Sequence, residues 1–205
     1  MLNVNPTRME LKRLKASTLT ARRGHKLLKD KHDEMVKQFI VLSRQAKQLR
    51  LQVQSALGEI YGSFDAAQDA MGASAVGAAL MWPGQSPELS VSDAKVMSVR
   101  IPKFELDYKS GDSYPYGPAF TSSRLDEAVD AMRRLAPVLV RLAESEKAVM
   151  LLASEIERTR RRVNALEYVL IPQQEETIKY ISSRLAENER GNLSRLMKMK
   201  DMQRR

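Results

Sequence analysis

Cysteine is absent from the 205-residue chain, and histidine occurs only at His25 and His32. The missing cysteines exclude a disulfide scaffold, a thiol nucleophile and any cysteine-ligated zinc site. The two histidines lie about two helical turns apart, whereas two ligands of one metal on a helix need a closer spacing. We therefore predict no metal site. We interpret both histidines as polar residues of a helical seam that set its register, with a functional switch as the alternative.

Long apolar runs and aromatic side chains are also scarce. No stretch approaches the roughly 18 consecutive apolar residues that a membrane-spanning helix needs. The N-terminus has no basic stretch followed by an apolar one, as a secretory signal would, so we expect a cytoplasmic chain. Aromatic residues make up 5% of the chain, which is low for a compact core in a protein of this length.

Short motifs that would assign an enzymatic reaction are missing as well. The sequence has no phosphate-binding Gly-x-x-x-x-Gly-Lys-[Ser/Thr] and no dinucleotide-binding Gly-x-Gly-x-x-Gly. It also lacks the Gly-x-Ser-x-Gly of serine hydrolases. We therefore predict no catalytic residue and no cofactor, and an enzyme in its own right is the least supported class of function.

Charge, proline and glycine divide the chain into three segments. Residues 1–55 carry 13 basic and 4 acidic side chains, residues 56–120 carry 4 and 8, and residues 121–205 carry 17 and 13. Five of the eight prolines and seven of the nine glycines fall in the middle segment. This distribution predicts a loop-rich middle between two helical flanks. The net charge of +9 suggests an anionic or acidic partner without naming one.

The N-terminal flank has a sustained heptad repeat. Alternate steps of three and four residues from Leu11 to Ile60 give fifteen positions, of which twelve are apolar. This spacing is typical of a coiled-coil seam rather than of the wider apolar face of a globular helix. Asn5 or Thr7 is expected to cap the helix, with Pro6 in its first turn.

The C-terminal flank predicts a second long helix, capped by Ser122 or Ser123. Its predicted seam includes Leu152, Ile156, Thr159, Val163, Leu166 and Leu170. Because Pro172 lacks a backbone donor, we expect a kink or a phase shift there, and Pro137 is a second candidate for a bend. Beyond Pro172 the seam is expected to continue through Ile178, Ile181, Leu185, Leu196 and Met199.

Two seams on one chain predict an all-α-dominated fold. A helix within residues 1–61 and a helix within residues 124–205 would form a long antiparallel two-helix coiled coil. The connecting segment, residues 62–123, is long enough to let the second helix return. Its alanine-rich part, residues 64–80, predicts a short helix or a continuation of the first helix. Residues 92–101 and 104–108 predict a small β-hairpin around Pro102 and Lys103.

Basic side chains gather near the N-terminus, at residues 158–162 and at the C-terminal end. They are compatible with a solvated helix surface, with a surface that contacts another protein, or with nucleic-acid binding. We disfavour a nucleic-acid partner because stacking aromatics and a groove-reading fold are missing. In an antiparallel coiled coil the first and last clusters lie at the same end, which would be strongly positive.

Three ordered stretches resemble the D-subunit family of V-type and A-type ATPases. Residues 5–11 read Asn-Pro-Thr-Arg-Met-Glu-Leu, and residues 23–31 read Arg-Gly-His-Lys-Leu-Leu-Lys-Asp-Lys. Residues 159–167 read Thr-Arg-Arg-Arg-Val-Asn-Ala-Leu-Glu. The resemblance covers about residues 3–60 and 125–200, together with Val-Met-Ser-Val-Arg-Ile-Pro at 96–102.

The resemblance implies a non-catalytic central rotor shaft of a rotary ATPase. The coiled coil would enter a hexameric head of alternating A and B subunits. It would transmit torque between ATP hydrolysis or synthesis there and H⁺ or Na⁺ translocation in a membrane ring. Further implied partners are the small F subunit of the central stalk and a funnel-shaped subunit above the ring, with residues 62–123 toward the membrane. The chain would be peripheral on the membrane, without a span. A generic coiled-coil scaffold or tether is the alternative, although it needs only the seam.

The resemblance also implies which residues contact the head. The tip of the shaft would consist of Asn5, Pro6, Thr7, Arg8, Leu11, Lys12, Leu196, Met199 and Lys200. The lower part of the central channel of the head would face Arg160, Arg161, Arg162 and Asn164. Long, flexible lysine, arginine and methionine side chains suit weak contacts that are repeated at three similar interfaces.

Overall fold

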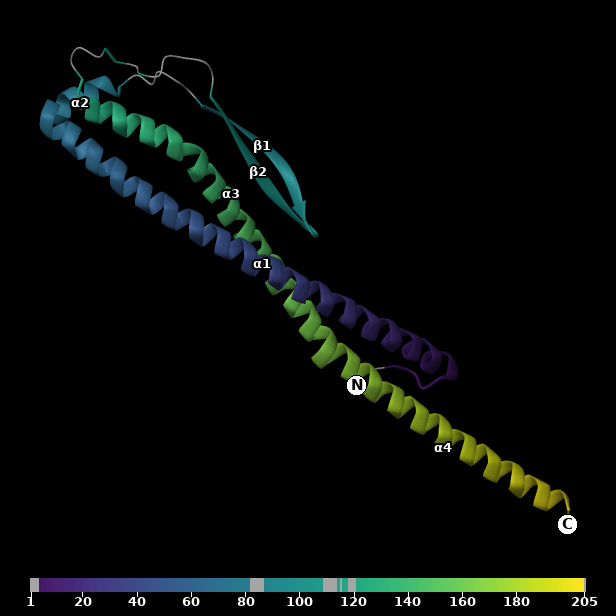
Figure 1. Ribbon diagram of the computed structural model, residues 1–205. Coiled ribbons are helices and arrows are strands. Elements are labelled where there is room, and N and C mark those ends of the chain that lie inside the picture. Colours follow the sequence, from purple (N-terminus) through teal and green to yellow (C-terminus); the bar gives the residue numbers. More distant parts are fainter. Residues whose placement is uncertain (1–3, 82–86, 109–113, 115, 118–120, 205) are drawn as a thin grey trace. The chain divides into compact units, whose positions relative to one another are not determined.

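The computed structural model describes residues 4–81, 87–108, 114, 116–117 and 121–204. Its elements are the helices α1 (Arg8–Met71) and α2 (Ala73–Ala79), the strands β1 (Pro87–Val96) and β2 (Val99–Tyr108), the helix α3 (Ser123–Ala165), the π-helix η2 (Leu166–Leu170) and the helix α4 (Ile171–Gln203) (Figure 1). The predicted class is confirmed: two long helices flank a short helix and a β-hairpin. The chain forms two compact units, unit 1 (residues 1–34 and 156–205) and unit 2 (residues 35–155).

Both long helices begin at polar caps. The Thr7 hydroxyl oxygen accepts a hydrogen bond from the backbone N–H of Glu10 at 3.2 Å, so Thr7 is the cap of α1. Pro6 therefore lies just before the helix and not in its first turn, where the sequence places it. The Ser122 hydroxyl oxygen caps α3 in the same way, accepting from the backbone N–H of Arg124 at 3.3 Å.

The helix α1 extends ten residues beyond the predicted end at residue 61. The heptad next passes through Ala67, which is fully buried, while Phe64 and Met71, each one residue beyond the heptad positions Ser63 and Ala70, pack against the same cluster. The helix ends at Gly72, whose φ of 83° lies in the region that glycine adopts without a Cβ clash. The short helix α2 follows at once, so the alanine-rich stretch contains both predicted alternatives.

Two buried clusters hold α1 against α3 in unit 2. One contains Val53, Ile60 and Leu135, and the other contains Ala67, Val76 of α2 and Leu125. As the residue numbers rise along α1, those of its partners in α3 fall, which is the predicted antiparallel order. Farther along the same pair of helices, Arg50 binds Glu146 at 2.6 Å.

The β-hairpin turns at a place that the sequence does not indicate. Val96 pairs with Val99, so the turn residues are Met97 and Ser98, and Pro102 pairs with Asp93 inside the ladder. The turn predicted around Pro102 and Lys103 is therefore wrong. Two-residue hairpin turns need a positive φ, which usually requires glycine or asparagine. Here Met97 adopts a φ of 55°, so the usual sequence signal is missing.

The alternation of the ladder explains how Pro102 fits within β2. Antiparallel pairs alternate between hydrogen-bonded and non-bonded types. Counted from the Val96–Val99 pair, Pro102 and Phe104 belong to non-bonded pairs, so their backbone nitrogens face away from β1. Pro102 therefore removes no ladder bond. The outward N–H of Phe104 donates to Glu144 of α3 at 3.2 Å, and the hairpin lies alongside this helix (Figure 1).

We expect Glu144→Ala to loosen the hairpin from α3. A hydrogen bond to a charged group contributes about 1.5–3 kcal/mol, so exchange of the Phe104 amide hydrogen should become at least about tenfold faster. Hydrogen exchange followed by mass spectrometry or NMR of the full chain measures this rate. Arg141→Ala, an exposed change in the same helix, is the control. Unchanged protection of Phe104 in Glu144→Ala would show that this contact does not anchor the strand.

Two tyrosines bind the start of α3. The Tyr116 hydroxyl donates to Asp126 at 2.8 Å, and the Tyr114 hydroxyl donates to Asp130 at 2.7 Å. Burial, followed by the hydrogen bond to Asp126, raises the pKa of Tyr116 well above its usual range. The proton is therefore bound more tightly in the folded state than in the unfolded state.

This pKa shift predicts an alkaline loss of stability. The contribution of Tyr116 is fully present below the unfolded tyrosine pKa of about 10 and is lost as the pH rises above it. Tyr116→Phe should flatten the fall in unfolding free energy between about pH 10 and pH 11, relative to wild type. Urea unfolding across this range measures the slope. Equal slopes for the two proteins would exclude the effect.

Candidate partner interface

Unit 1 consists of the first part of α1 packed against the end of α3, η2 and α4. Three pairs join the two sides: Arg8 with Glu189, Arg22 with Glu175 at 2.6 Å, and His25 with Glu167 at 3.3 Å. Their numbers run in opposite directions, so the helices are antiparallel in this unit too. All thirteen residues predicted to contact the head belong to unit 1.

The seam of unit 1 is mixed: four of its seven buried side chains in the described ranges are polar, and the other three are Leu14, Val163 and Ile181. Its buried side chains include Thr18 of α1, Thr159 of α3, and Gln174 and Thr177 of α4. The Gln174 amide nitrogen donates to the Ser17 hydroxyl at 3.1 Å. Its carbonyl oxygen is buried and has no hydrogen-bond partner among the described residues. Polar seam residues specify register at a cost in stability, and the sequence does not single out Gln174 as one of them.

The N-terminal group of predicted residues surrounds the start of α1. Asn5, Pro6, Thr7, Arg8 and Lys12 are exposed, and Leu11 is half-buried. Arg8 binds Glu189 of α4, although both side chains remain largely exposed. The hydroxyl oxygen of Thr7 also caps α1 by accepting a hydrogen bond from the backbone N–H of Glu10.

The C-terminal group lies on a part of α4 that has no helix beside it among the described residues. Leu196 and Met199 are 62% and 57% exposed, so the prediction that they continue the seam is wrong. The reason is the length of α1, which starts at Arg8 and meets α4 at Glu189. Beyond that point α4 exposes an apolar set that sequence analysis only partly identified, namely Leu193, Leu196, Met197, Met199 and Met202.

The arginine group occupies the last turns of α3. Arg160, Arg161, Arg162 and Asn164 are exposed, while Thr159 just before them and Val163 among them are buried in the seam. Consecutive residues lie about 100° apart around a helix, so the three guanidinium groups cover roughly 200° of its surface. Arg161 binds Glu157 at 2.6 Å, whereas Arg160 and Arg162 form no ion pair in the described part of the chain.

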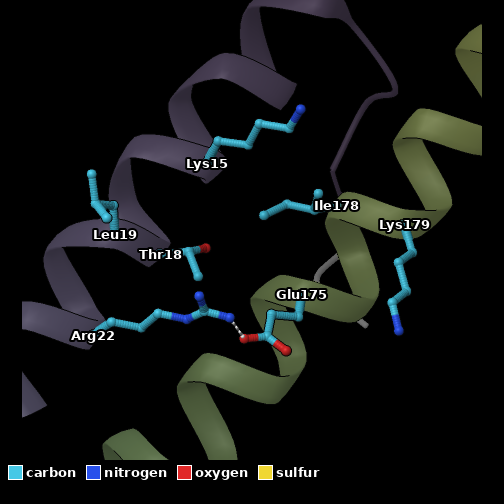
Figure 2. Close-up of a pocket in the computed structure, with 7 residues that line it drawn as sticks. All are labelled: Lys15, Thr18, Leu19, Arg22, Glu175, Ile178 and Lys179. Atoms are coloured by element: carbon cyan, nitrogen blue, oxygen red, sulfur yellow. Dashed lines mark hydrogen bonds and ion pairs between the residues drawn. The ribbon is translucent and has the colours of Figure 1, made fainter.

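A groove of about 390 Å³ separates α1 and α4 in this unit (Figure 2). Lys15 and Leu19 of α1 and Ile178 and Lys179 of α4 line it, with the Arg22–Glu175 ion pair alongside. Neither Lys15 nor Lys179 forms an ion pair with a described residue. Sequence reasoning did not identify this groove, because Lys15, Leu19 and Arg22 have the same spacing as an ordinary solvated helix face.

Positive charge is concentrated in unit 1. Residues 1–34 and 156–205 contain 21 basic and 11 acidic side chains, whereas residues 35–155 contain 13 and 14. The N-terminal cluster, the arginine group and the C-terminal cluster all belong to unit 1, which therefore carries the net charge of the chain. An electropositive surface of this kind favours association with acidic partners.

The described residues provide neither a metal site nor a membrane span. No group of three or more histidine, cysteine, aspartate or glutamate side chains is placed to hold a metal ion within the described ranges. His25 and His32 contact different carboxylates, Glu167 and Asp33. In this same part of the chain, no helix combines the length and apolar character needed to cross a bilayer.

Comparison with known proteins covers nearly the whole chain. The family model for the ATP synthase D subunit matches residues 10–201. The V-type ATP synthase D subunit of Clostridioides difficile (strain 630) is 53% identical over 203 residues, which are 98% of this chain and 91% of that protein. The corresponding protein of Acetivibrio thermocellus is 53% identical over 98% of this chain and 92% of its own length. That of Thermoanaerobacter sp. (strain X514) is 51% identical over 98% and 97%.

These matches include both helical flanks, the connecting segment and the arginine group, so they do not depend on the heptad repeat alone. The resemblance inferred from the three ordered stretches is therefore confirmed, and the chain belongs to the family of ATP synthase D subunits.

Proposed function

We propose that this chain is the non-catalytic central-stalk component of a rotary V-type ATPase, the axle that couples ATP hydrolysis or synthesis in the head to H⁺ or Na⁺ translocation. The observation that carries this proposal is the similarity over nearly the full chain to proteins named as V-type ATP synthase D subunits. The antiparallel helix packing and the absence of catalytic motifs fit an element that transmits force.

We assign the head contacts to unit 1. Its N-terminal, C-terminal and arginine groups are exposed apart from the half-buried Leu11. Six of their thirteen residues are basic, and leucine and methionine lie among them. An axle must pass three similar catalytic interfaces without locking onto any of them. Exposed charges screened by water make weak contacts, and methionine adapts its shape to different surfaces, so this surface suits repeated binding and release.

The remaining partners follow from the same proposal. The head is a hexamer of alternating A and B subunits that surrounds unit 1. The small F subunit binds the shaft, and the connecting segment with the hairpin lies toward a funnel-shaped subunit above the membrane ring. The chain is peripheral on the cytoplasmic side of the membrane.

Coupling requires that the shaft be asymmetric. Two different helices present different side chains in each direction, so each catalytic interface meets a different face of the shaft. The head can then exert torque because its three conformations bind these faces with different free energies. No residue of the shaft needs to touch the nucleotide.

Binding to an isolated hexameric head that lacks its axle tests this function. We expect native mass spectrometry to show one copy per hexamer, together with an altered rate of ATP turnover. A folded, helical chain that does not associate with the head would contradict the axle assignment and favour the coiled-coil scaffold or tether. A helical protein of similar length and charge is the control for non-specific insertion.

A further inference from the structure

The π-helix η2 adds one residue to the seam of the C-terminal helix. Upstream, the inward positions follow a regular spacing of three and four residues: Ile156, Thr159, Val163 and Leu166. Downstream, the same spacing resumes at Ile171, Gln174, Ile178, Ile181 and Leu185, all of which are buried or half-buried. The step from Leu166 to Ile171 is five residues, one more than the heptad allows. The predicted phase shift therefore occurs just before Pro172.

The backbone accommodates this extra residue locally. The N–H of Ile171 donates to the carbonyl of Leu166, five residues back, in place of the usual four. Tyr168, Val169 and Leu170 all face outward, with exposures of 70%, 51% and 38%. In a regular α-helix three consecutive side chains cover roughly 200°, and the heptad would place Leu170 in the seam.

A second possible seam lies on α4, at positions one residue before those that face inward in the structure. If η2 became α-helical, the spacing from Leu166 would continue through Leu170, Gln173, Thr177, Tyr180 and Arg184. All of these side chains except Arg184 fit a seam. Leu170 would replace Ile171, Gln173 would replace Gln174 beside Ser17, and Thr177 is already buried.

The polar character of unit 1 reduces the cost of exchanging the two seams. The buried residues of α4 are Gln174, Thr177 and Ile181, and two of these three are polar. The neighbouring Gln173 offers the same amide group to Ser17. The clusters of unit 2 are aliphatic by contrast, and rotation there would remove well-packed apolar surface.

Pro172 favours the register seen in the structure. In a continuous α-helix its ring would clash with the carbonyl of Tyr168, and the missing N–H would leave that carbonyl without its helical partner. The wider turn of η2 immediately precedes Pro172 and avoids this conflict. The register with η2 present also turns Ile181 inward, whereas Tyr180 remains 38% exposed, and Thr177 is buried in this register too.

We propose that η2 is a register joint, about which α4 rotates against α1 by one residue, or about 100°. In the bulged register Ile171, Gln174, Ile178 and Ile181 form the seam. In the straight register Leu170, Gln173, Thr177 and Tyr180 form it. Pro172 sets the balance in favour of the bulged register.

Cross-linking of the full chain tests the joint, and the absence of cysteine makes introduced pairs unambiguous. The pair S17C/Q174C reports the bulged register, and S17C/Q173C reports the straight one, with a short bis-maleimide as the linker. S17C/E176C measures background cross-linking from a position on the exposed side of α4. We expect Pro172→Ala to raise the S17C/Q173C yield several-fold. A yield that stays at the S17C/E176C background in Pro172→Ala would overturn the proposal.

Deletion of Val169 in the Pro172→Ala chain provides a second, independent test. It removes the extra residue, so a straight helix then keeps the original seam. We expect the cross-link at position 174 to persist, the one at 173 to fall to background, and the unfolding midpoint to equal or exceed that of Pro172→Ala. Deletion of Leu27, an exposed apolar residue of α1 with no bulge beside it, should lower the midpoint. If the two deletions lower the unfolding midpoint equally, η2 does not contain one residue more than the heptad requires, and the proposal is wrong.

Discussion

Replacing Leu125 by alanine is expected to lower the free energy of unfolding by about 2–5 kcal/mol. Leu125 is fully buried where α1, α2 and α3 meet, in contact with the cluster of Ala67 and Val76. Two of its buried neighbours, Ala67 and Val76, are small and rigid, so they cannot move to fill the space that the lost methyl groups leave. Urea unfolding of the full chain, followed by circular dichroism, measures the change.

Leu89→Ala is the matched control for this core substitution. Leu89 lies in β1 and is 53% exposed, so the same truncation should cost well under 1 kcal/mol. If the two variants unfold at the same urea concentration, the cluster around Leu125 does not hold α1, α2 and α3 together.

Neutralising the arginine group should weaken binding to the head roughly tenfold while the fold stays intact. The triple variant R160Q/R161Q/R162Q removes three exposed cations, each worth about 0.5 kcal/mol in a hydrated contact. None of these side chains is buried, so helix content should not change. Titration of the axle-free head with the variant measures affinity, and ion transport per ATP hydrolysed measures coupling.

The variant R124Q/R134Q/R141Q removes the same charge from exposed positions of the same helix in unit 2. It should bind the head nearly as well as wild type. If the two triple variants lose affinity equally, binding follows net charge and the arginine group has no special role. If the first triple variant binds and couples like wild type, these arginines do not contact the head.

The long helices and their antiparallel pairing could be predicted because a heptad repeat records the buried face of a coiled coil along its whole length. Thr18 and Val53 lie where the seam predicts, and both are buried. The same repeat reaches Ala67 in the continuation of α1, although Phe64 there packs one residue beyond the heptad position Ser63. Local signals also narrow each cap to two candidates, of which Thr7 and Ser122 form the capping hydrogen bonds, because the side chain itself supplies the acceptor.

Other features depend on backbone conformations or partners that residue types do not specify. The hairpin turn uses Met97 at a positive φ, and Pro102 is tolerated because of its place in the ladder alternation. The bulge at η2 is predictable only as a phase shift, because any residue near Pro172 could carry it. The predicted seam runs too far, to Met199, because an exposed apolar stripe on a helix has the same periodicity as a buried one.

The spacing of paired residues along the chain also determines when each pair can form during synthesis. The backbone N–H of Ser122 reaches the Met71 sulfur across 51 residues, whereas Arg50 and Glu146 are 96 apart and Arg8 and Glu189 are 181 apart. Of these three pairs, Arg8 therefore waits longest for its partner. Loop closure also becomes more costly with length, so pairing should start beside the connecting segment and spread outward. Until then the nascent N-terminal segment must stay soluble alone, and the nine basic side chains among its first 34 residues serve that need.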